Sequence, residues 1–322
     1  MATFHSKQNT TLVGKEVTFG TAVTTDKDLG LIQAVTPADK RGYTKVKAAG
    51  SREIQELVAG KSEPTFDFEV FQQNGRVFEL LLGTKDSSTP TSGDNTHIFS
   101  IGTTIPSFTM EYSFDASTDS RFLYDGCKLS NGTISIDQEG ILKVAVSGTA
   151  QSVTTNTTAS AAILSTLNVL AYKHLTLSTG TPDSETSVGK LQSFSMTFEN
   201  TPTPVDSAGT FEVQETVAGD SEITFEFALM FENLTEYEIF AGSTTPQIQP
   251  TAVGLVVNAN NGVTLGSGRR EFEVQLLGVQ YEEAGTPLTV GEVIIQTFKG
   301  SATGLGTNLL FVVDTVTSAA FF

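Results

Sequence analysis

The chain has 322 residues, of which 39% are hydrophobic and 9% aromatic, and its formal net charge is −17 with a pI near 4.5. This acidic balance argues against a protein that grips nucleic acid, because such a grip needs clustered Lys and Arg. The single cysteine, Cys127, excludes an intrachain disulfide, and with three histidines it leaves almost no material for a zinc site. Residues 1–16 lack the apolar core of an export signal, and no apolar run approaches the roughly 18 residues of a membrane helix. We therefore expect a chain made and folded in a reducing cytoplasm.

A long polar segment precedes the first clear strand. Residues 36–51 show no apolar periodicity, so we expect them to form a loop. This segment is also the most basic part of the chain, with Lys40, Arg41, Lys45 and Lys47. Solvated loop charge is the ordinary explanation, and a salt-sensitive contact with an acidic neighbour is the sharper one.

The next segment predicts a half-buried strand and a short helix. Residues 65–70 alternate polar and apolar side chains, with Asp67 and Glu69 on the polar face. Asn74 can cap a helix over residues 76–82, where apolar side chains recur at helical spacing. Further along we expect a surface loop over residues 87–96 and strands over residues 107–114, 128–136 and 141–147.

The second half repeats this order. A polar stretch over residues 200–210 precedes a strand over residues 224–229, which carries Glu226 on its polar face. A short helix over residues 237–240 follows. Later strands are expected over residues 271–277, 292–298 and 309–316.

The likeness of the halves is direct. Residues 53–84 align without a gap with residues 212–243, an offset of 212 − 53 = 159, and about 14 of the 32 aligned positions are identical. Self-similarity at one fixed spacing indicates two copies of one folding unit. We place the first domain at residues 1–155 and the second at 156–322, because residues 151–160 form a Thr/Ser/Asn-rich run between periodic segments.

Catalytic motifs are missing from the sequence. It has no Gly-rich phosphate loop, no GxSxG elbow and no HExxH. The pairs Asp67/Glu69 and Glu282/Glu283 offer carboxylates that a glycosidase would need, but Ala228 stands where the repeat predicts the counterpart of Glu69. We interpret the following residues as surface or structural: His5, His97, His174 and Cys127. We expect no catalytic residue, no metal and no cofactor.

Six segments, in their order along the chain, carry a resemblance to a known family. They are residues 16–22, 58–62, 106–111, 122–128, 268–272 and 293–300. No single one is diagnostic, but their order together with the duplication resembles the tail tube proteins (major tail proteins) of long, non-contractile-tailed phages, in the version with two tube domains in one chain. The resemblance spans nearly the whole sequence.

The resemblance implies a fold and an assembly. The fold would be mainly β, with two tandem β-sandwich or barrel domains, each with one short flanking α-helix and a long loop between rings. Rings of three chains, pseudo-hexameric because each chain fills two of six positions, would stack into a hollow tube that delivers the viral DNA. The implied partners are further copies of the chain, the tape measure protein, the tail terminator and distal tail proteins, with DNA passing without specific binding. The implied place is the virion tail, after assembly in the host cytoplasm, with no membrane contact.

Two sets of residues follow as candidates for this role. A phosphate-binding lining would hold DNA back, so we expect a polar, acidic bore lined by Asp67, Glu69 and Glu226. The basic segment would contact the next ring through Lys40, Arg41, Lys45 and Lys47.

Two alternatives remain open from the sequence. One is a monomeric two-domain β-sandwich that binds carbohydrate or another surface, although such modules usually expose Trp or Tyr platforms and this chain has no Trp and six Tyr. The other is a glycan-cleaving enzyme, which the unmatched carboxylates disfavour.

Overall fold

The computed structural model describes residues 10–91, 94–113, 121–138, 140–156, 168–180, 184–244, 252–265, 268–286, 293–302 and 309–314. Part of the boundary run expected at residues 151–160, namely residues 157–160, lies outside these ranges, as do the ends of three expected strands, residue 114, residue 292 and residues 315–316.

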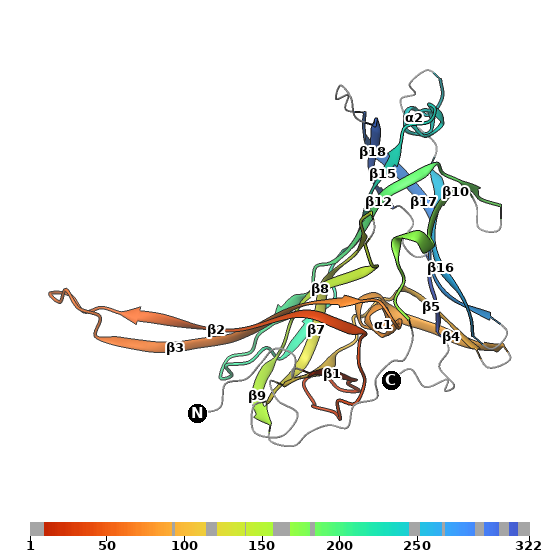
Figure 1. The fold of residues 1–322 in the computed structure, drawn as a ribbon. Coiled ribbons are helices and arrows are strands. Elements are labelled where there is room, and N and C mark those ends of the chain that lie inside the picture. Colours follow the sequence, from red (N-terminus) through yellow and green to blue (C-terminus); the bar gives the residue numbers. More distant parts are fainter. Residues whose placement is uncertain are drawn as a thin grey trace.

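The fold is mainly β, as predicted, with two short α-helices among the described residues (Figure 1). The first half contains β1 (Thr10–Lys15), β2 (Leu31–Val46), β3 (Glu56–Phe71), α1 (Arg76–Leu82), β4 (Gly83–Thr91), β5 (Asp94–Ile101), β6 (Phe108–Ser113), β7 (Arg121–Ile136), β8 (Lys143–Thr149) and β9 (Ser152–Asn156). The second half contains a 3₁₀ turn (Tyr172–His174), β10 (Leu175–Thr179), β11 (Thr186–Ser187), β12 (Lys190–Asn200), β13 (Thr203–Val205), β14 (Glu215–Val217), β15 (Ser221–Met230), α2 (Thr235–Ala241), β16 (Val253–Leu265), β17 (Gly268–Gly285), β18 (Ile295–Ala302) and β19 (Leu309–Asp314).

A central antiparallel sheet runs through both halves. Its strands lie in the order β2, β3, β8, β7, β12, β15, β18, β17, so four strands of the first half are followed by four of the second. We call the β7–β12 pairing the seam. There, Phe194 is opposite Ile136, and the hydroxyls of Thr133 and Thr197 lie 3.0 Å apart. Backbone pairing therefore joins the two halves into one surface.

The β2–β3 and β12–β15 pairings have the same register. Val35 is opposite Phe68 in the first half, and Phe194 is opposite Phe227 in the second, both at the offset of 159. The irregularity in the register also recurs. The β2–β3 pairing shifts between Ile32 and Ala34, and the β12–β15 pairing shifts between Leu191 and Ser193, at the same offset of 159. Bulges re-aim and fix the pairing of a strand, so this shared irregularity is a structural counterpart of the sequence repeat.

The β7–β8 and β17–β18 pairings also match, at an offset of 152. Asn131 is opposite Ser147, and Glu283 is opposite Lys299. The register shifts immediately before Asn131 in one pair and immediately before Glu283 in the other. The offset falls from 159 at the β12–β15 pairing to 152 at the β17–β18 pairing. The chain between these two pairings is therefore seven residues shorter (159 − 152) than the chain between β2–β3 and β7–β8.

The apolar face of the central sheet forms the core. Phe66 and Phe68 stack with their centroids 6.1 Å apart, and Phe225 and Phe227 stack at the same 6.1 Å. All four rings are buried, which confirms the predicted alternation in residues 65–70 and 224–229. In the first half a second layer covers this face, since β6 brings Phe108 edge-on to Phe66 at 5.9 Å.

The two helices occupy equivalent places but differ in burial. Asn74 Oδ1 accepts a hydrogen bond from Arg76 N at 3.2 Å, and Asn233 Oδ1 accepts one from Thr235 N at 2.9 Å. The predicted helix over residues 76–82 is confirmed, whereas the second helix begins at Thr235, two residues before the predicted start at residue 237. Every residue of α1 is buried, whereas Ala241 is the one buried residue of α2. The glycine at position 132 lets α1 lie directly on β7. The equivalent helix α2 is only partly buried.

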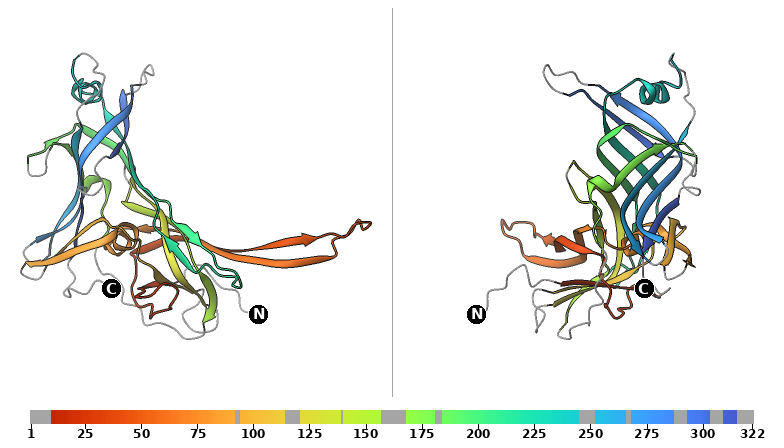
Figure 2. Two further views of the ribbon diagram at one scale, coloured as in Figure 1. Left: turned by 180° about the vertical axis from the view of Figure 1, so that it is seen from behind. Right: turned by 45° about the vertical axis from the view of Figure 1, so that its right-hand side comes forward.

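The predicted loop over residues 36–51 is wrong for most of its length. Residues 36–46 belong to β2, which pairs with β3 to form a long hairpin that projects from the body (Figures 1 and 2). We call the part of this hairpin that lies beyond the β3–β8 pairing, residues 39–64, the arm. Both faces of its outer part are exposed, so its side chains need no apolar alternation and left no strand signature. The loop expected at residues 87–96 is likewise mostly strand, within the β4–β5 hairpin.

Candidate functional site

The candidate site is the polar face of the central sheet. Strand alternation brings polar residues of both halves to this face, because neighbouring strands keep their side chains in register. Asp67 is opposite Thr36 and Glu226 is opposite Ser195, the same pairing at the offset of 159, so the two repeated acids occupy equivalent positions. The carboxylates of this face, from four strands, are Asp67, Glu69, Glu199, Glu222, Glu226 and Glu283.

Two lysines moderate the negative charge of this face. Lys143 Nζ lies 3.8 Å from Glu69 Oε1. Lys299 Nζ lies 3.8 Å from both Glu226 Oε2 and Glu283 Oε2. These pairs are substantially open to solvent, so each contributes little to stability. With six carboxylates and two ammonium groups, the described part of this face is net acidic.

The polar face is hollowed and uncovered. Side chains of four neighbouring strands line a shallow hollow there: Ala34, Thr36, Asp67, Glu69, Asn131, Thr133, Ala145 and Ser147. The opposite, apolar face is the one against which α1 packs, since a Cβ at Gly132 would lie 2.4 Å from Leu81 Cδ2. Asp67 and Glu226 are exposed and Glu69 is half-buried. The structure therefore brings the three predicted acids onto one accessible surface, while their role as a bore lining stays a prediction.

The four basic candidates lie on the arm. Lys40, Arg41, Lys45 and Lys47 are all exposed, and all but Lys47 belong to β2. Lys40 is opposite Glu63 within the arm, on the continuation of the polar face. The arm carries these charges away from the body, and their contact with a neighbouring ring stays a prediction.

A contact between the halves was not found from the sequence. The second hairpin, β13–β14 with its connection (residues 203–217), is the counterpart of the outer arm at the offset of 159. It packs against the first half. Lys61 Nζ lies 2.8 Å from Asp206 Oδ1, Gln151 Nε2 donates to Val213 O at 2.7 Å, and Lys128 Nζ donates to Thr216 O. Residues 200–210 were expected as a free loop; in the structure this segment includes β13 and folds back onto the same chain.

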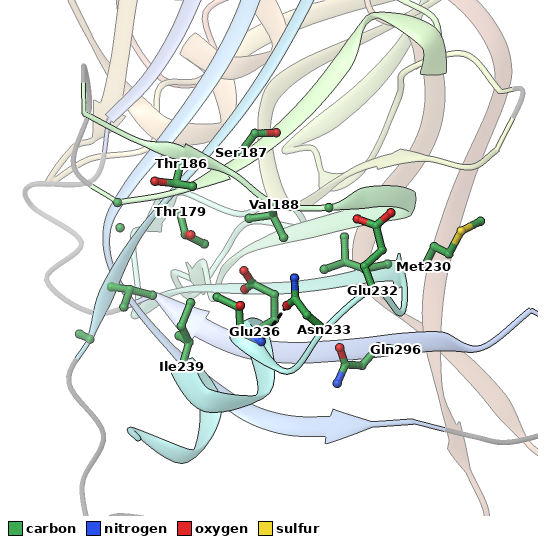
Figure 3. Close-up of a pocket in the computed structure, with 17 residues that line it drawn as sticks. Thr179, Thr186, Ser187, Val188, Met230, Glu232, Asn233, Glu236, Ile239 and Gln296 are labelled. Carbon is green, nitrogen blue, oxygen red and sulfur yellow. Dashed lines mark hydrogen bonds between the residues drawn. The ribbon is translucent and has the colours of Figure 1, made fainter. Parts of the chain in front are cut away.

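A second hollow lies beside α2. It is lined by β10, β11, the end of β15, α2, the start of β16 and β18, with Glu232, Asn233 and Glu236 directed toward it (Figure 3). Burial raises the pKa of Glu236, and its carboxylate accepts a hydrogen bond from Tyr281 at 3.2 Å. In the first half the equivalent region is closed by the buried pair of Arg76 and Asp28, 2.6 Å apart. The hollow thus marks the side on which α2 lacks the cover that α1 has.

Two potentially reactive side chains elsewhere in the chain, Cys127 and His97, are buried in the core. Cys127 is fully buried, and burial raises the pKa of its thiol well above the usual range. His97 is buried on β5, and burial together with the charges of Lys85 and Arg76 lowers its pKa to about 4. Within the described ranges, no three His, Cys, Asp or Glu residues gather where they could hold a metal ion. A search of those same ranges finds no helix of the length and apolarity that crossing a membrane requires.

Comparison with known proteins identifies the family. The family profile described as "Phage tail tube protein" matches residues 6–302, nearly the whole chain. None of the curated proteins compared with the chain matches it.

Proposed function

Because the chain belongs to the phage tail tube protein family, and is therefore a structural protein of the virion tail rather than an enzyme, we propose that it polymerises as stacked rings into the hollow tube that delivers viral DNA. Each ring would contain three chains. The chain would supply two adjacent, similar domains, residues 1–155 and 156–322, so that three chains fill six positions.

The observation that carries this proposal is the central sheet. It consists of a four-strand unit used twice, β2–β3–β8–β7 and β12–β15–β18–β17, with matching registers and matching bulges. A sheet with two open ends invites further pairing, and closure into a barrel removes both ends. Three copies would close a barrel of 24 strands, eight from each chain. Such a barrel has an inner and an outer face throughout, as a tube wall requires.

The polar face suits the inside of that barrel. DNA must slide through the bore, and a lining that bound phosphate would hold it through release of counterions. Asp67, Glu69 and Glu226 present carboxylates instead, and the lysines nearby are each placed beside a carboxylate. The apolar face is already used by the core. We therefore propose that the polar face lines the bore and that DNA passes without specific binding.

The arm and the ends of the tube would make the remaining contacts. The arm projects beyond the body with exposed apolar side chains at Tyr43, Leu57 and Val58. An exposed apolar patch on a projecting element marks a protein interface, and we propose that the outer arm contacts other copies of the chain. A finished tail would also engage the tape measure protein inside the tube, and terminator and distal proteins at its ends, with assembly in the host cytoplasm. The alternative of a monomeric carbohydrate-binding module has no support in the family match.

Electron microscopy of the purified chain tests the proposal. Concentrated protein should form rings or hollow tubes, with threefold symmetry and a pseudo-sixfold repeat in ring averages. A variant with residues 43–58 replaced by a short turn keeps the described body and serves as the matched control; it should give isolated rings or monomers. Compact monomers of the full chain at all concentrations and salt conditions would refute ring formation.

A further inference from the structure

Three of the four types of strand pairing in the central sheet occur twice. The pairings β2–β3, β3–β8 and β7–β8 recur as β12–β15, β15–β18 and β17–β18 with the same registers. The fourth type, β7 with β12, occurs once, at the seam. Its counterpart would join β17 with β2, and these two strands lie at opposite ends of the eight-strand sheet. One chain cannot bring them together, whereas two copies can.

The two edges are available for this contact. Among the described residues, β2 pairs with β3 alone, and β17 from Tyr281 to Gly285 pairs with β18 alone. We infer that β2 of a first copy pairs with β17 of a second copy. The arm of the first copy then packs on the second half of the second copy, in the same way that the second hairpin packs on the first half within one chain. This inference rests on the proposed function and specifies the contact that would close its ring.

The seam predicts the register between copies. Glu199 of β12 is opposite Asn131 of β7. The residue of β2 that corresponds to Glu199 is Lys40 (199 − 159), and the residue of β17 that corresponds to Asn131 is Glu283 (131 + 152). The seam therefore predicts that Lys40 of the first copy is opposite Glu283 of the second copy. Their charges are opposite and both belong to the polar face. The neighbouring pair moves from Thr197 and Thr133 to Ala38 and Gly285 in the same way.

The seat of the hairpin predicts a second complementary charge pair. Within one chain, Lys61 on β3 meets Asp206 on the second hairpin at 2.8 Å. At the offset of 159, Asp220 replaces Lys61 and Lys47 replaces Asp206. The charges change places and the pair stays complementary. Lys47 and Asp220 are both exposed in the single chain, as a contact between copies requires.

The helices support the same placement. At the seam, Asn200 Nδ2 donates a hydrogen bond to Leu81 O, near the end of the buried helix α1, at 2.7 Å. Arg41 corresponds to Asn200, and Phe240 corresponds to Leu81. In the contact between copies, Arg41 of the first copy would therefore meet the carbonyl of Phe240 near the C-terminal end of α2 in the second copy, where the helix dipole favours a cation. Leu234 beside α2 and Tyr237 within it are 56% and 40% exposed. This end of α2 in the second copy thus lies where the first half of the first copy would contact it.

The arm has a place to bend onto this seat. In the second half, β12 ends at Asn200 and β13 begins at Thr203, and this break turns the second hairpin onto the body. The equivalent place in the arm holds Gly42, at the register shift of the β2–β3 pairing, beside Gly60. A bend at these glycines would bring Lys47 to the partner. In this arrangement Lys40, Arg41 and Lys47 contact the neighbouring copy in the same ring. The sequence predicted instead that they contact the next ring.

Cysteine cross-linking tests the register. In a Cys127→Ala background, Lys40→Cys with Glu283→Cys should form a disulfide between copies, because cross-strand neighbours lie within disulfide range. Oxidation of assembled protein should give covalent species that end at three chains. Asn131→Cys with Glu199→Cys, the observed seam pair, is the positive control and should cross-link within one chain. Ala34→Cys with Glu283→Cys lies six residues out of register and should give no bond.

The outcomes separate the inference from the proposed function. Tubes that form, with the seam control oxidised but no bond between positions 40 and 283, would overturn the inference and leave the tube intact. A covalent ladder that extends beyond three chains would place the arm on the next ring and would also overturn it. Absence of rings and tubes at every concentration would remove the proposed function, and the inference with it.

Charge reversal gives an independent test of the seat. Lys47→Asp and Asp220→Lys should each raise the protein concentration needed for assembly by about fivefold, the upper range for an exposed ion pair. The double variant should return to within about twofold of the natural chain. Equal defects that add in the double variant would contradict the pairing.

Discussion

Lys61 on β3 and Asp206 on the second hairpin form an ion pair of 2.8 Å that spans 145 residues of sequence (206 − 61) and fastens the second half to the first. The backbone adds to it, since Ser62 N donates to Phe211 O at 3.0 Å. Together these contacts hold the second hairpin against the first half. Its counterpart in the first half, the arm, is left projecting.

Removal of this ion pair should loosen the hairpin without unfolding the body. The side chains of Lys61 and Asp206 are 26% and 56% exposed, so solvent screening limits their coupling to about 0.2–1 kcal/mol. A double-mutant cycle with Lys61→Ala and Asp206→Ala, read by denaturant unfolding, should return a value in this range. Faster proteolysis within residues 206–214 should accompany both single variants. A coupling near zero with unchanged proteolysis would show that the backbone contacts alone hold the hairpin.

A side chain at position 132 should displace α1 from the sheet. A Cβ there would lie 2.4 Å from Leu81 Cδ2 and 3.3 Å from Val146 Cγ1. Gly132→Val should therefore destabilise the fold by about 1–3 kcal/mol, the usual cost of overpacking, measured by denaturant unfolding. Gly42→Ala is the control, because nothing lies within 4 Å of its Cβ position and its stability should stay near that of the natural chain. Equal stability of the two variants would contradict the close packing of α1 on β7.

A positive charge in the proposed bore should slow DNA in a salt-dependent way. Asp67 is exposed on the polar face, so Asp67→Lys should leave assembly intact. DNA release from assembled tails should fall at low ionic strength and recover as salt rises, because each added phosphate contact depends on counterion release. Asp67→Asn, which removes the charge without reversing it, should release DNA at nearly the normal rate. Identical release from both variants at all salt concentrations would place Asp67 outside the bore.

Acidification should destabilise the fold through His97. Its pKa is lowered from 6.5 to about 4 by burial and by the charges of Lys85 and Arg76. Between these values the unfolded chain binds a proton that the folded chain does not, so the free energy of unfolding falls as pH drops from about 6.5 to 4. The loss from this one group should reach about 3 kcal/mol. Unfolding curves at several pH values measure it, and His97→Gln should flatten this part of the profile. An unchanged slope in the variant would assign the pH dependence to other groups.

Cys127 should react with thiol reagents only after unfolding. Its side chain is fully buried, and burial raises the pKa of the thiol. In native protein, labelling with an aromatic disulfide reagent should be negligible over hours. In denaturant it should reach one thiol per chain, in agreement with the single cysteine. Rapid stoichiometric labelling of the native chain would show that β7 opens locally at this position.

Local patterns in the sequence were enough to predict several elements. The alternation around Phe66 and Phe68 identified a strand with one polar face, because side chains of a strand point to opposite sides in turn. Asn74 indicated the start of the first helix, because a short side-chain oxygen can satisfy the first free N–H groups, and its Oδ1 accepts a hydrogen bond from Arg76 N. The repeat at 159 residues predicted equivalent pairings, and the registers of the two hairpins agree with it.

The arm shows where local patterns fail. Strand pairing uses backbone N–H and C=O groups that every residue carries, and a hairpin exposed on both faces needs no apolar alternation. Residues 36–46 therefore looked like a polar loop while forming part of β2. The basic residues in this segment lie together on the arm, but the neighbour that they face depends on where the hairpin points.

The sequence by itself determined that this protein has two similar halves, each with a long polar segment, a strand of acidic and apolar faces and a short helix, in that order. Period, capping and repetition are local properties, so one chain read in order reveals them. Tertiary structure alone decided that β7 and β12 join the halves, that Asp67 and Glu226 share one surface, and that the second hairpin folds back while the first remains extended. These arrangements depend on contacts between residues far apart in the chain, such as Lys61 with Asp206, and no local pattern encodes which distant partner a strand edge will meet.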